Sequence, residues 1–179
     1  MPGPYGWLFD PRLCIECRAC EAACKQWNSV PVGVNVRYRV VRIREYGSWP
    51  NVSTVPVSSA CNHCENALCA RACPVKAYVR RADGIVLLDS SRCVGCGFCD
   101  QFCPYGAPQM NRRSRRMEKC TMCADRIDRG LQPACASICP TGALTWGEWE
   151  KIRDRGVASI SGDPTPNTTR PRIRYVHAP

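Results

Sequence analysis

Residues 14–24 read CIECRACEAAC, and residues 93–103 read CVGCGFCDQFC. Both stretches follow the pattern C-x2-C-x2-C-x3-C, in which two residues between cysteines let the backbone curl around one face of an iron–sulfur cube. The fourth cysteine lies on the following helical turn and faces away, so it binds the neighbouring cluster. The two stretches therefore predict [4Fe–4S] clusters that are arranged in pairs.

The remaining cysteines form two further groups of four, and none is left over. The second group reads CNHCENALCARAC at residues 61–73, and the fourth reads CTMC at 120–123 followed, after eleven residues, by CASIC at 135–139. Sixteen cysteines in 179 residues accompany only 8% aromatic residues, too few for a hydrophobic core to hold the chain together alone. Four bound [4Fe–4S] clusters are expected to supply part of the folding free energy.

Other uses of cysteine fit this spacing less well. Eight disulfides would suit a secreted protein, but neighbouring cysteines in repeated C-x2-C turns are poor disulfide partners. Zinc fits separated C-x2-C pairs, which describes the fourth group alone but not the C-x2-C-x2-C triplets. The motif C-x-x-C-H does not occur, which excludes covalently attached haem.

The strand signals between the groups indicate which groups form one module. Residues 74–92, PVKAYVRRADGIVLLDSSR, read as a strand, a turn at Asp83-Gly84 and a second strand, the internal hairpin of a two-cluster ferredoxin. Strand candidates at Tyr5–Phe9 and Ala143–Trp146 flank the first and fourth groups and are expected to pair. We therefore predict an α+β fold of two nested bacterial-ferredoxin-like modules with much irregular structure. Sequential pairing of the groups is the alternative.

Under nested pairing, each group lends its fourth cysteine to the cluster of its partner group. The predicted ligand sets are Cys14, Cys17, Cys20 and Cys139 for cluster A; Cys61, Cys64, Cys69 and Cys103 for cluster B; Cys93, Cys96, Cys99 and Cys73 for cluster C; and Cys120, Cys123, Cys135 and Cys24 for cluster D.

The groups divide the chain into an outer module at residues 1–60 and 104–150, an inserted module at 61–103 and a tail at 151–179. Within residues 30–57, the alternating stretch VNVRYRVVRIREY predicts an amphipathic strand or edge hairpin that covers a module. The tail is rich in Pro, Thr and Arg, which predicts an extended segment that wraps a partner subunit, with disorder as the alternative.

The charge balance at first suggests a nucleic-acid-binding protein. Lysine and arginine outnumber aspartate and glutamate by 25 to 15, and RRSRR occupies residues 112–116. Sixteen thiolates and four cubane cores of about +2 each would, however, bring the formal charge down to about +2. We therefore interpret the basic excess as a counter-charge for anionic clusters and expect no nucleic-acid partner. We interpret RRSRR as a solvated loop, with docking against a partner subunit or anionic headgroups as the alternative.

The sequence contains no predicted membrane span or secretory signal. The longest aliphatic run, Ile85–Leu88, is far shorter than the roughly 20 apolar residues that a spanning helix needs. The first residues, MPGPYGWLFDPRLC, contain neither a basic n-region nor an apolar h-region. We expect cluster assembly in the cytoplasm, and a final site that is cytoplasmic or, after co-export with a partner, at the periplasmic side of a membrane.

Three stretches resemble a known family. They are CNHCENALCARACP, CPYGAPQMN and KCTMCADRIDRGLQPACASICPTGAL, which begin at residues 61, 103 and 119. They closely resemble signatures of the iron–sulfur subunits that serve molybdenum and tungsten bis-pterin enzymes, such as dimethyl sulfoxide reductase, polysulfide reductase and formate dehydrogenase. The resemblance covers about residues 5–150. It implies the nested ligand pairing given above, and four [4Fe–4S] clusters because all sixteen cysteines are present.

The resemblance predicts an electron-transfer subunit that is not itself catalytic. It implies a molybdenum or tungsten bis-pterin catalytic subunit as one partner, and a membrane quinone-reactive subunit, a flavin subunit or further copies of the chain as candidates for the other. The alternative is a stand-alone or hydrogenase-associated polyferredoxin, including the polyferredoxin subunit of a tungsten aldehyde oxidoreductase. No nucleotide fingerprint or nucleophile with its base is present, and His63 is expected to lie near cluster B without binding iron.

Overall fold

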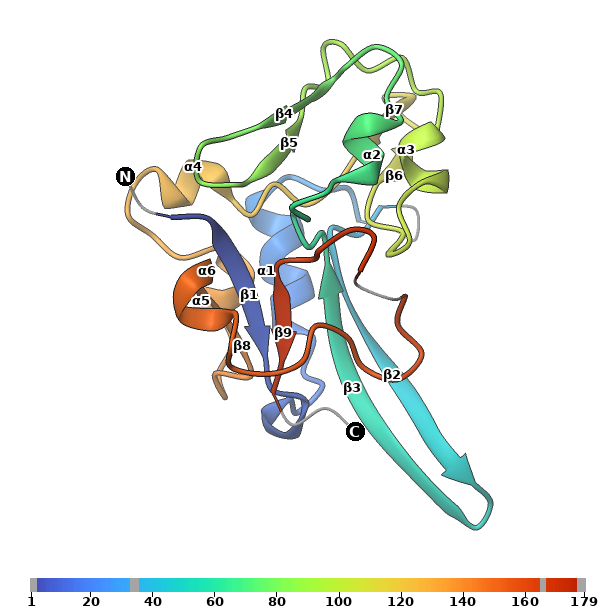
Figure 1. The fold of residues 1–179 in the computed structure, drawn as a ribbon, viewed down its shortest axis with the longest axis vertical. Helices are drawn as coiled ribbons and strands as arrows, with labels where there is room; N and C mark the ends of the chain where they lie inside the picture. The colour runs from blue at the N-terminus through green and yellow to red at the C-terminus, as the bar shows by residue number, and fades with distance from the viewer. Residues whose placement is uncertain (1–2, 33–35, 165–166, 177–179) are drawn as a thin grey trace.

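The computed structural model describes residues 3–32, 36–164 and 167–176. A small sheet lies at its centre (Figure 1), with β1 (Tyr5–Phe9) between β8 (Leu144–Glu148) and β9 (Ile173–Tyr175). Strand β8 is antiparallel to β1, and Trp7 lies opposite Trp146. This confirms the predicted pairing of the two strands that flank the first and fourth cysteine groups.

The third strand of this sheet, β9, comes from the tail and was not predicted as a strand. It runs parallel to β1, and the alternate residues Ile173 and Tyr175 are buried. Proline, threonine and arginine dominate the tail composition and obscure this short apolar alternation, which finds its partner only in the folded chain. The described tail therefore packs against its own chain. The tail residues 165–166 and 177–179 lie outside the described residues.

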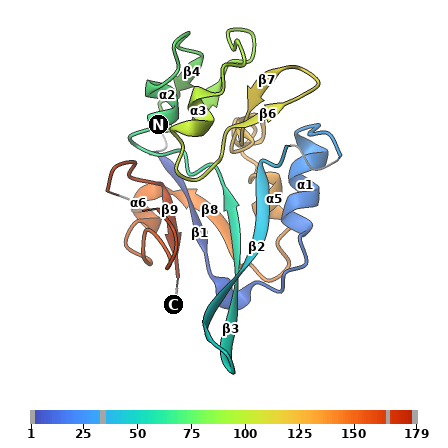
Figure 2. The ribbon, with the colours of Figure 1, turned by 90° about the vertical axis from the view of Figure 1, so that its right-hand side faces the viewer.

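Two ten-residue strands, β2 (Arg39–Ser48) and β3 (Asn51–Ala60), form the hairpin predicted within residues 30–57, of which 33–35 are not described. Figures 1 and 2 show that its tip extends well beyond the rest of the molecule. The half near the body is buried at Val41 and Val57, because the alternating apolar side chains of that half face the core. At the tip, the Trp49 side chain is 89% exposed.

The segment between the second and third cysteine groups contains the predicted hairpin. Strands β4 (Tyr78–Arg80) and β5 (Val86–Leu88) are antiparallel, and the Asp83 carboxylate accepts a hydrogen bond from the amide of Ile85 in the turn. Gly84 has a φ of +77°, which residues with a side chain rarely adopt. The turn residues Asp83-Gly84 thus perform the role that the sequence predicted.

A second short hairpin contains the arginine run. Strands β6 (Gln109–Asn111) and β7 (Arg116–Glu118) are antiparallel, and the intervening residues 112–115 are exposed. The position of these arginines in a solvated turn agrees with the interpretation of the run as a solvated loop.

The helices are short, and several of them carry cysteines. They are the 3-10 helix η1 (Pro11–Leu13) and the α-helices α1 (Ala19–Trp27), α2 (Leu68–Arg71), α3 (Phe98–Gln101), α4 (Ala124–Ile127), α5 (Ala134–Ser137) and α6 (Trp149–Ile152). Small sheets and short helices joined by irregular segments confirm the predicted α+β class. Within the described ranges, no helix has the length and apolar character needed to cross a membrane.

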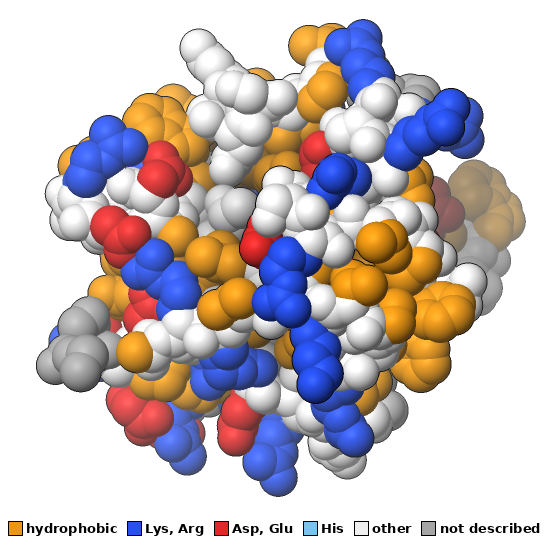
Figure 3. Space-filling model, turned by 90° about the horizontal axis from the view of Figure 1, so that it is seen from above, with side chains coloured by type: hydrophobic (Ala, Val, Ile, Leu, Met, Phe, Trp, Pro, Cys, Tyr) orange, Lys and Arg blue, Asp and Glu red, His pale blue; other side chains and the backbone are white. Residues whose placement is uncertain are grey.

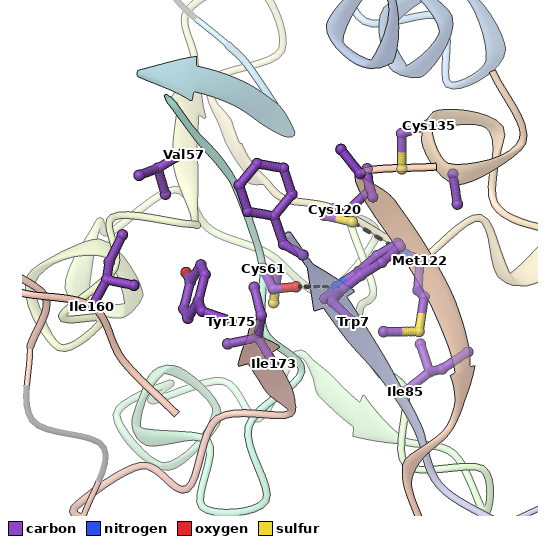
Figure 4. Close-up of a cluster of buried hydrophobic side chains, with 14 of the residues drawn as sticks. Trp7, Val57, Cys61, Ile85, Cys120, Met122, Cys135, Ile160, Ile173 and Tyr175 are labelled. Atoms are coloured by element: carbon purple, nitrogen blue, oxygen red, sulfur yellow. Dashed lines mark hydrogen bonds between the residues drawn. The ribbon is translucent and has the colours of Figure 1, made fainter. Parts of the chain in front are cut away.

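The main core gathers around Trp7 of the central sheet. Figure 4 shows Trp7 beside Met122, with Ile85, Cys61 and Cys120 in the same cluster, and the indole N–H of Trp7 donates a 3.1 Å hydrogen bond to the Cys61 carbonyl. The core therefore mixes ordinary apolar side chains with cysteines from two different groups.

Candidate iron–sulfur sites

The first hollow brings together cysteines that are far apart in the sequence. It is lined by the four cysteines predicted for cluster A: Cys14, Cys17, Cys20 and Cys139. The loop curls because Glu16, between Cys14 and Cys17, and Arg18, between Cys17 and Cys20, have left-handed backbones with φ of +57° and +56°. Pairing of β1 with β8 carries the fourth cysteine group to this loop.

A second hollow contains the set predicted for cluster B: Cys61, Cys64, Cys69 and Cys103. Its loop also includes a left-handed residue, His63, with a φ of +44°. Backbone amides point at two of the sulfurs, because His63 N lies 3.5 Å from Cys61 Sγ and Ala107 N lies 3.5 Å from Cys103 Sγ. Such amide donors stabilise the thiolate form that binds iron.

For sets C and D, the evidence that their cysteines lie near one another is the electrostatic effect of one thiol on another. For the set predicted for cluster C, Cys93 and Cys73 both contribute to the raised pKa of Cys99, after burial, which is the largest cause. The Cys73 thiol also accepts a 3.3 Å hydrogen bond from the amide of Ala77. The third group therefore lies beside the last cysteine of the second group.

In the set predicted for cluster D, the first and fourth groups meet again. Burial, followed by the neighbouring Cys135 and Cys123, raises the pKa of Cys24 to about 12. The side-chain amide of Asn28 lies 3.8 Å from Cys24 Sγ and 3.7 Å from Cys123 Sγ. Helix α1 thus delivers its last cysteine to the thiols of the fourth group.

The donor sets fit anionic iron–sulfur cubes. All sixteen cysteines are free. The structure brings together all four cysteines of sets A, B and D, and Cys73, Cys93 and Cys99 of set C. Burial and mutual repulsion of thiolates raise the pKa of several of these thiols, as at Cys69, where burial and Cys61 raise it to about 12. Iron cations would relieve this repulsion, because thiolates are the ligands that iron–sulfur clusters take. The chemistry supplied by bound clusters is one-electron transfer.

Cys139 behaves differently from the deeply buried thiols. Burial opposes ionisation here too, but hydrogen bonds from the amide of Leu144 and from Thr141 outweigh it, so the pKa of Cys139 lies below its ordinary value. The Leu144 amide lies 3.5 Å from the sulfur. The turn that follows Cys139-Pro140 brings this donor to the thiol, and the same turn after Cys73 and Cys103 places an amide on each of those sulfurs.

His63 lies in the wall of the cluster B hollow, as its position between two cysteines suggested. Its Nδ1 accepts a 3.1 Å hydrogen bond from the amide of Val86, and its buried Nε2 has no partner among the described residues. Burial and the nearby Lys119 hold the His63 pKa well below its ordinary value, so the ring is neutral. The hydrogen-bond pattern assigns the ring proton to Nε2.

Two buried cations near the thiols were not predicted individually. Lys119 is 3% exposed, lines the cluster B hollow, and donates hydrogen bonds to the carbonyls of Val86 and Cys120. Arg39 is buried at the start of β2. The position of Lys119 directly before Cys120 could have indicated that this lysine lies near a cluster. Nothing in the alternating strand pattern distinguishes Arg39 from its exposed neighbours.

Comparison with known proteins agrees with this geometry. The protein matches the family described as a 4Fe-4S dicluster domain over residues 52–149, and a 4Fe-4S binding domain over residues 11–28. It is 37% identical to one of the chains of the anaerobic dimethyl sulfoxide reductase of Escherichia coli (strain K12), over 97% of its own length and 88% of that relative.

Two further relatives belong to other reductases and dehydrogenases. One of the subunits of the tetrathionate reductase of Salmonella typhimurium is 40% identical, over 80% of the present sequence and 58% of that relative. The nitrate-inducible formate dehydrogenase iron-sulfur subunit of Escherichia coli (strain K12) is 36% identical, over 86% of the present sequence and 58% of that relative. The protein therefore belongs to the family of four-cluster iron–sulfur subunits, and it is an electron-transfer subunit with four [4Fe–4S] clusters.

Proposed function

We propose that this protein relays single electrons between a molybdenum or tungsten bis-pterin catalytic subunit and a second redox partner. The observation that carries the proposal is that thiols of different cysteine sets lie close enough to act on one another, while Cys17 of set A and Cys96 of set C are exposed. The names of the relatives, which are components of reductases and of formate dehydrogenase, support a catalytic partner of this kind.

The ligands in this proposal are the sixteen cysteines, divided into the sets A to D given above. The same division makes residues 1–60 and 104–150 an outer module around an inserted module at 61–103. Cluster assembly in the cytoplasm belongs to the proposal, and a partner that carries an export signal would determine any other final site.

Electrostatic effects between thiols of different sets support the order A, D, B, C. Burial and, after it, Cys135 of set D raise the pKa of Cys20 in set A, although Arg39 and a hydrogen bond with Ser58 lower it. Burial and Cys24 are the main causes of the raised pKa of Cys120, and Cys61 of set B follows them. Cys99 of set C is among the groups that act on Cys69 of set B. Electrons would thus pass from one end of the series to the other through adjacent clusters.

Both ends of the series are surrounded by exposed apolar side chains. Ile15 and Leu13 flank Cys17, and Val94 and Phe98 flank Cys96. Figure 3 views the end of the molecule that carries the inserted module, and apolar side chains there gather into patches between basic ones. These surfaces are suited to docking two different proteins, because exposed apolar groups beside a cofactor mark protein contacts.

The first test is the metal content of the complex purified anaerobically from its native host. We expect about sixteen iron atoms per polypeptide, four for each cluster, with molybdenum or tungsten in fixed ratio. Iron at this level with neither metal would favour a stand-alone polyferredoxin. Zinc in place of iron would contradict the cluster assignment.

Paired cysteine substitutions test the ligand sets. Cys14→Ser and Cys139→Ser should alter the same cluster, so the double variant should show one altered EPR signal on reduction and three normal ones. The matched control is Cys14→Ser with Cys73→Ser, which should alter two clusters. Sequential pairing of the cysteine groups makes the opposite prediction for both pairs, so the count of altered clusters decides between the two arrangements.

A further inference from the structure

Arg39 is a buried cation at the junction of several cysteine groups. It is the first residue of β2, lies opposite Ala60 of β3, and is only 2% exposed. A buried guanidinium is expensive unless its charge and its N–H groups are compensated. The groups that compensate the charge and the N–H groups of Arg39 therefore indicate its role.

The hydrogen bonds of Arg39 within the protein are incomplete. Its Nη1 donates to the Ser58 carbonyl at 3.3 Å and to the Ser58 hydroxyl at 3.0 Å, and its guanidinium stacks over the Trp7 ring at 4.5 Å. Its Nε and Nη2 are buried and have no partner among the described residues. Because buried donors are nearly always satisfied in folded proteins, these two groups need acceptors, and the Cys135 thiol of set D lies within reach of the guanidinium.

The surroundings of Arg39 are thiols of two different cluster sets. The Ser58 hydroxyl that binds its Nη1 also lies 3.7 Å from Cys20 Sγ of set A. Burial lowers the pKa of Arg39, but Cys135 and Cys120 of set D, followed by Cys20 and Cys24, raise it, and the net shift is upward. The guanidinium therefore lies between sets A and D.

We propose that Arg39 is a fixed positive charge shared by clusters A and D, that its free N–H groups serve their sulfur atoms, and that it raises both reduction potentials. Each reduction adds one negative charge to a cluster, so a nearby cation favours the reduced form. A charge common to both clusters shifts both reduction potentials in the same direction. It therefore changes the difference between the two potentials, which drives electron transfer between them, only slightly. This inference rests on the ligand sets of the proposed function.

Arginine suits this position better than lysine. Its charge persists under any condition in which the protein folds, and its planar group can stack on Trp7 while its N–H groups point in several directions. Trp7 in turn donates to the carbonyl of Cys61, a set B cysteine, so the same stack also connects to the next cluster in the series.

The test is an EPR-monitored redox titration of the anaerobically purified complex. In Arg39→Gln, we expect the reduced-to-oxidised ratios of clusters A and D at a fixed potential to fall about tenfold, which is a shift of about 59 mV for a one-electron couple. Cluster C serves as an internal reference and should not move. The matched control is Arg42→Gln, three residues along the same strand but exposed, which should leave all four potentials unchanged.

The outcomes separate this inference from the proposed function. Full iron content with unchanged potentials of clusters A and D in Arg39→Gln would overturn the inference and leave the electron relay intact. Low iron in the unsubstituted complex would overturn the relay itself. If the Arg39→Gln variant loses iron while the unsubstituted complex and Arg42→Gln keep theirs, the Arg39→Lys variant distinguishes a requirement for the charge from a structural role. Full iron and shifts smaller than tenfold in the lysine variant would show that the charge is required, whereas loss of iron in this variant too would assign Arg39 a purely structural role.

Discussion

The outer and inserted parts of the proposed division carry the same kind of cysteine groups with very different amounts of regular structure. The outer part contains strands β1 and β8 of the central sheet, the ten-residue strands β2 and β3, and the nine-residue helix α1. In the inserted part, residues 61–103, each helix or strand is three or four residues long. Short hairpins and single helical turns are barely stable by themselves, so the inserted part depends more strongly on its clusters.

The two parts also differ in their cores. The outer core gathers large side chains such as Trp7, Phe9 and Tyr175. The inserted part contributes Val86, beside alanine and cysteine, to a smaller core that Met117 of β7, from the outer part, completes. Because hydrophobic stabilisation grows with the apolar area removed from water, the outer core contributes more to folding per residue.

Removal of iron should produce the largest difference between the two parts. We expect a chelator under anaerobic conditions to abolish amide protection from hydrogen exchange at residues 61–103, while amides of β2 and β3 keep much of theirs. Hydrogen exchange measured by mass spectrometry, before and after iron removal, gives the comparison. Equal loss of protection in both parts would contradict the idea that the inserted part depends more strongly on its clusters than the outer part does.

Substitution of Lys119 should have the next largest effect. Lys119→Met leaves the buried carbonyls of Val86 and Cys120 without their donor, at about 1–3 kcal/mol each, so we expect a loss of about 2–6 kcal/mol of stability. The midpoint of denaturant-induced cluster loss measures this change. Lys151→Met is the control, because Lys151 is exposed and forms only a surface ion pair with Glu148, and its loss should be under about 1 kcal/mol.

Trp7→Phe should have an intermediate effect, because Trp7 connects the outer sheet to the first cysteine of the inserted part. The change removes the donor to the Cys61 carbonyl and weakens the stack with Arg39, for an expected loss of about 1–3 kcal/mol. Thermal denaturation under anaerobic conditions tests this. Trp49→Phe at the exposed hairpin tip should leave the melting temperature unchanged, and equal losses in the two variants would show that the buried contact is unimportant.

The smallest effect is expected at the exposed contact between the tail and the inserted part. Arg170 forms a 3.3 Å ion pair with Glu65, but backbone hydrogen bonds join Glu65 to Arg170 and Asn66 to Thr169 independently of that side chain. Arg170→Ala should therefore lower stability by less than about 1 kcal/mol, and the difference should shrink further at high salt. A larger loss that persists in salt would show that the side chain itself holds the tail in place.

The tail shows why part of the fold could not be predicted. Its composition indicated an extended or disordered segment, yet Ile173 and Tyr175 form a strand beside β1. A three-residue strand has too little periodicity to be recognised, and its stability comes from a neighbour that lies far away in the sequence. The β4–β5 hairpin was predictable because Asp83-Gly84 is a local turn signal that acts between adjacent strands.

The sequence by itself determined the kind and number of cofactors, since the spacing of cysteines around an iron–sulfur cube is set by a few consecutive residues. It also determined which terminal strands pair. Only the tertiary structure decided that Arg39 rather than Arg42 is enclosed among thiols. The physical reason is distance along the sequence, because burial and charge at Arg39 are produced by groups from β1, β3 and the fourth cysteine group, which meet only when the polypeptide folds.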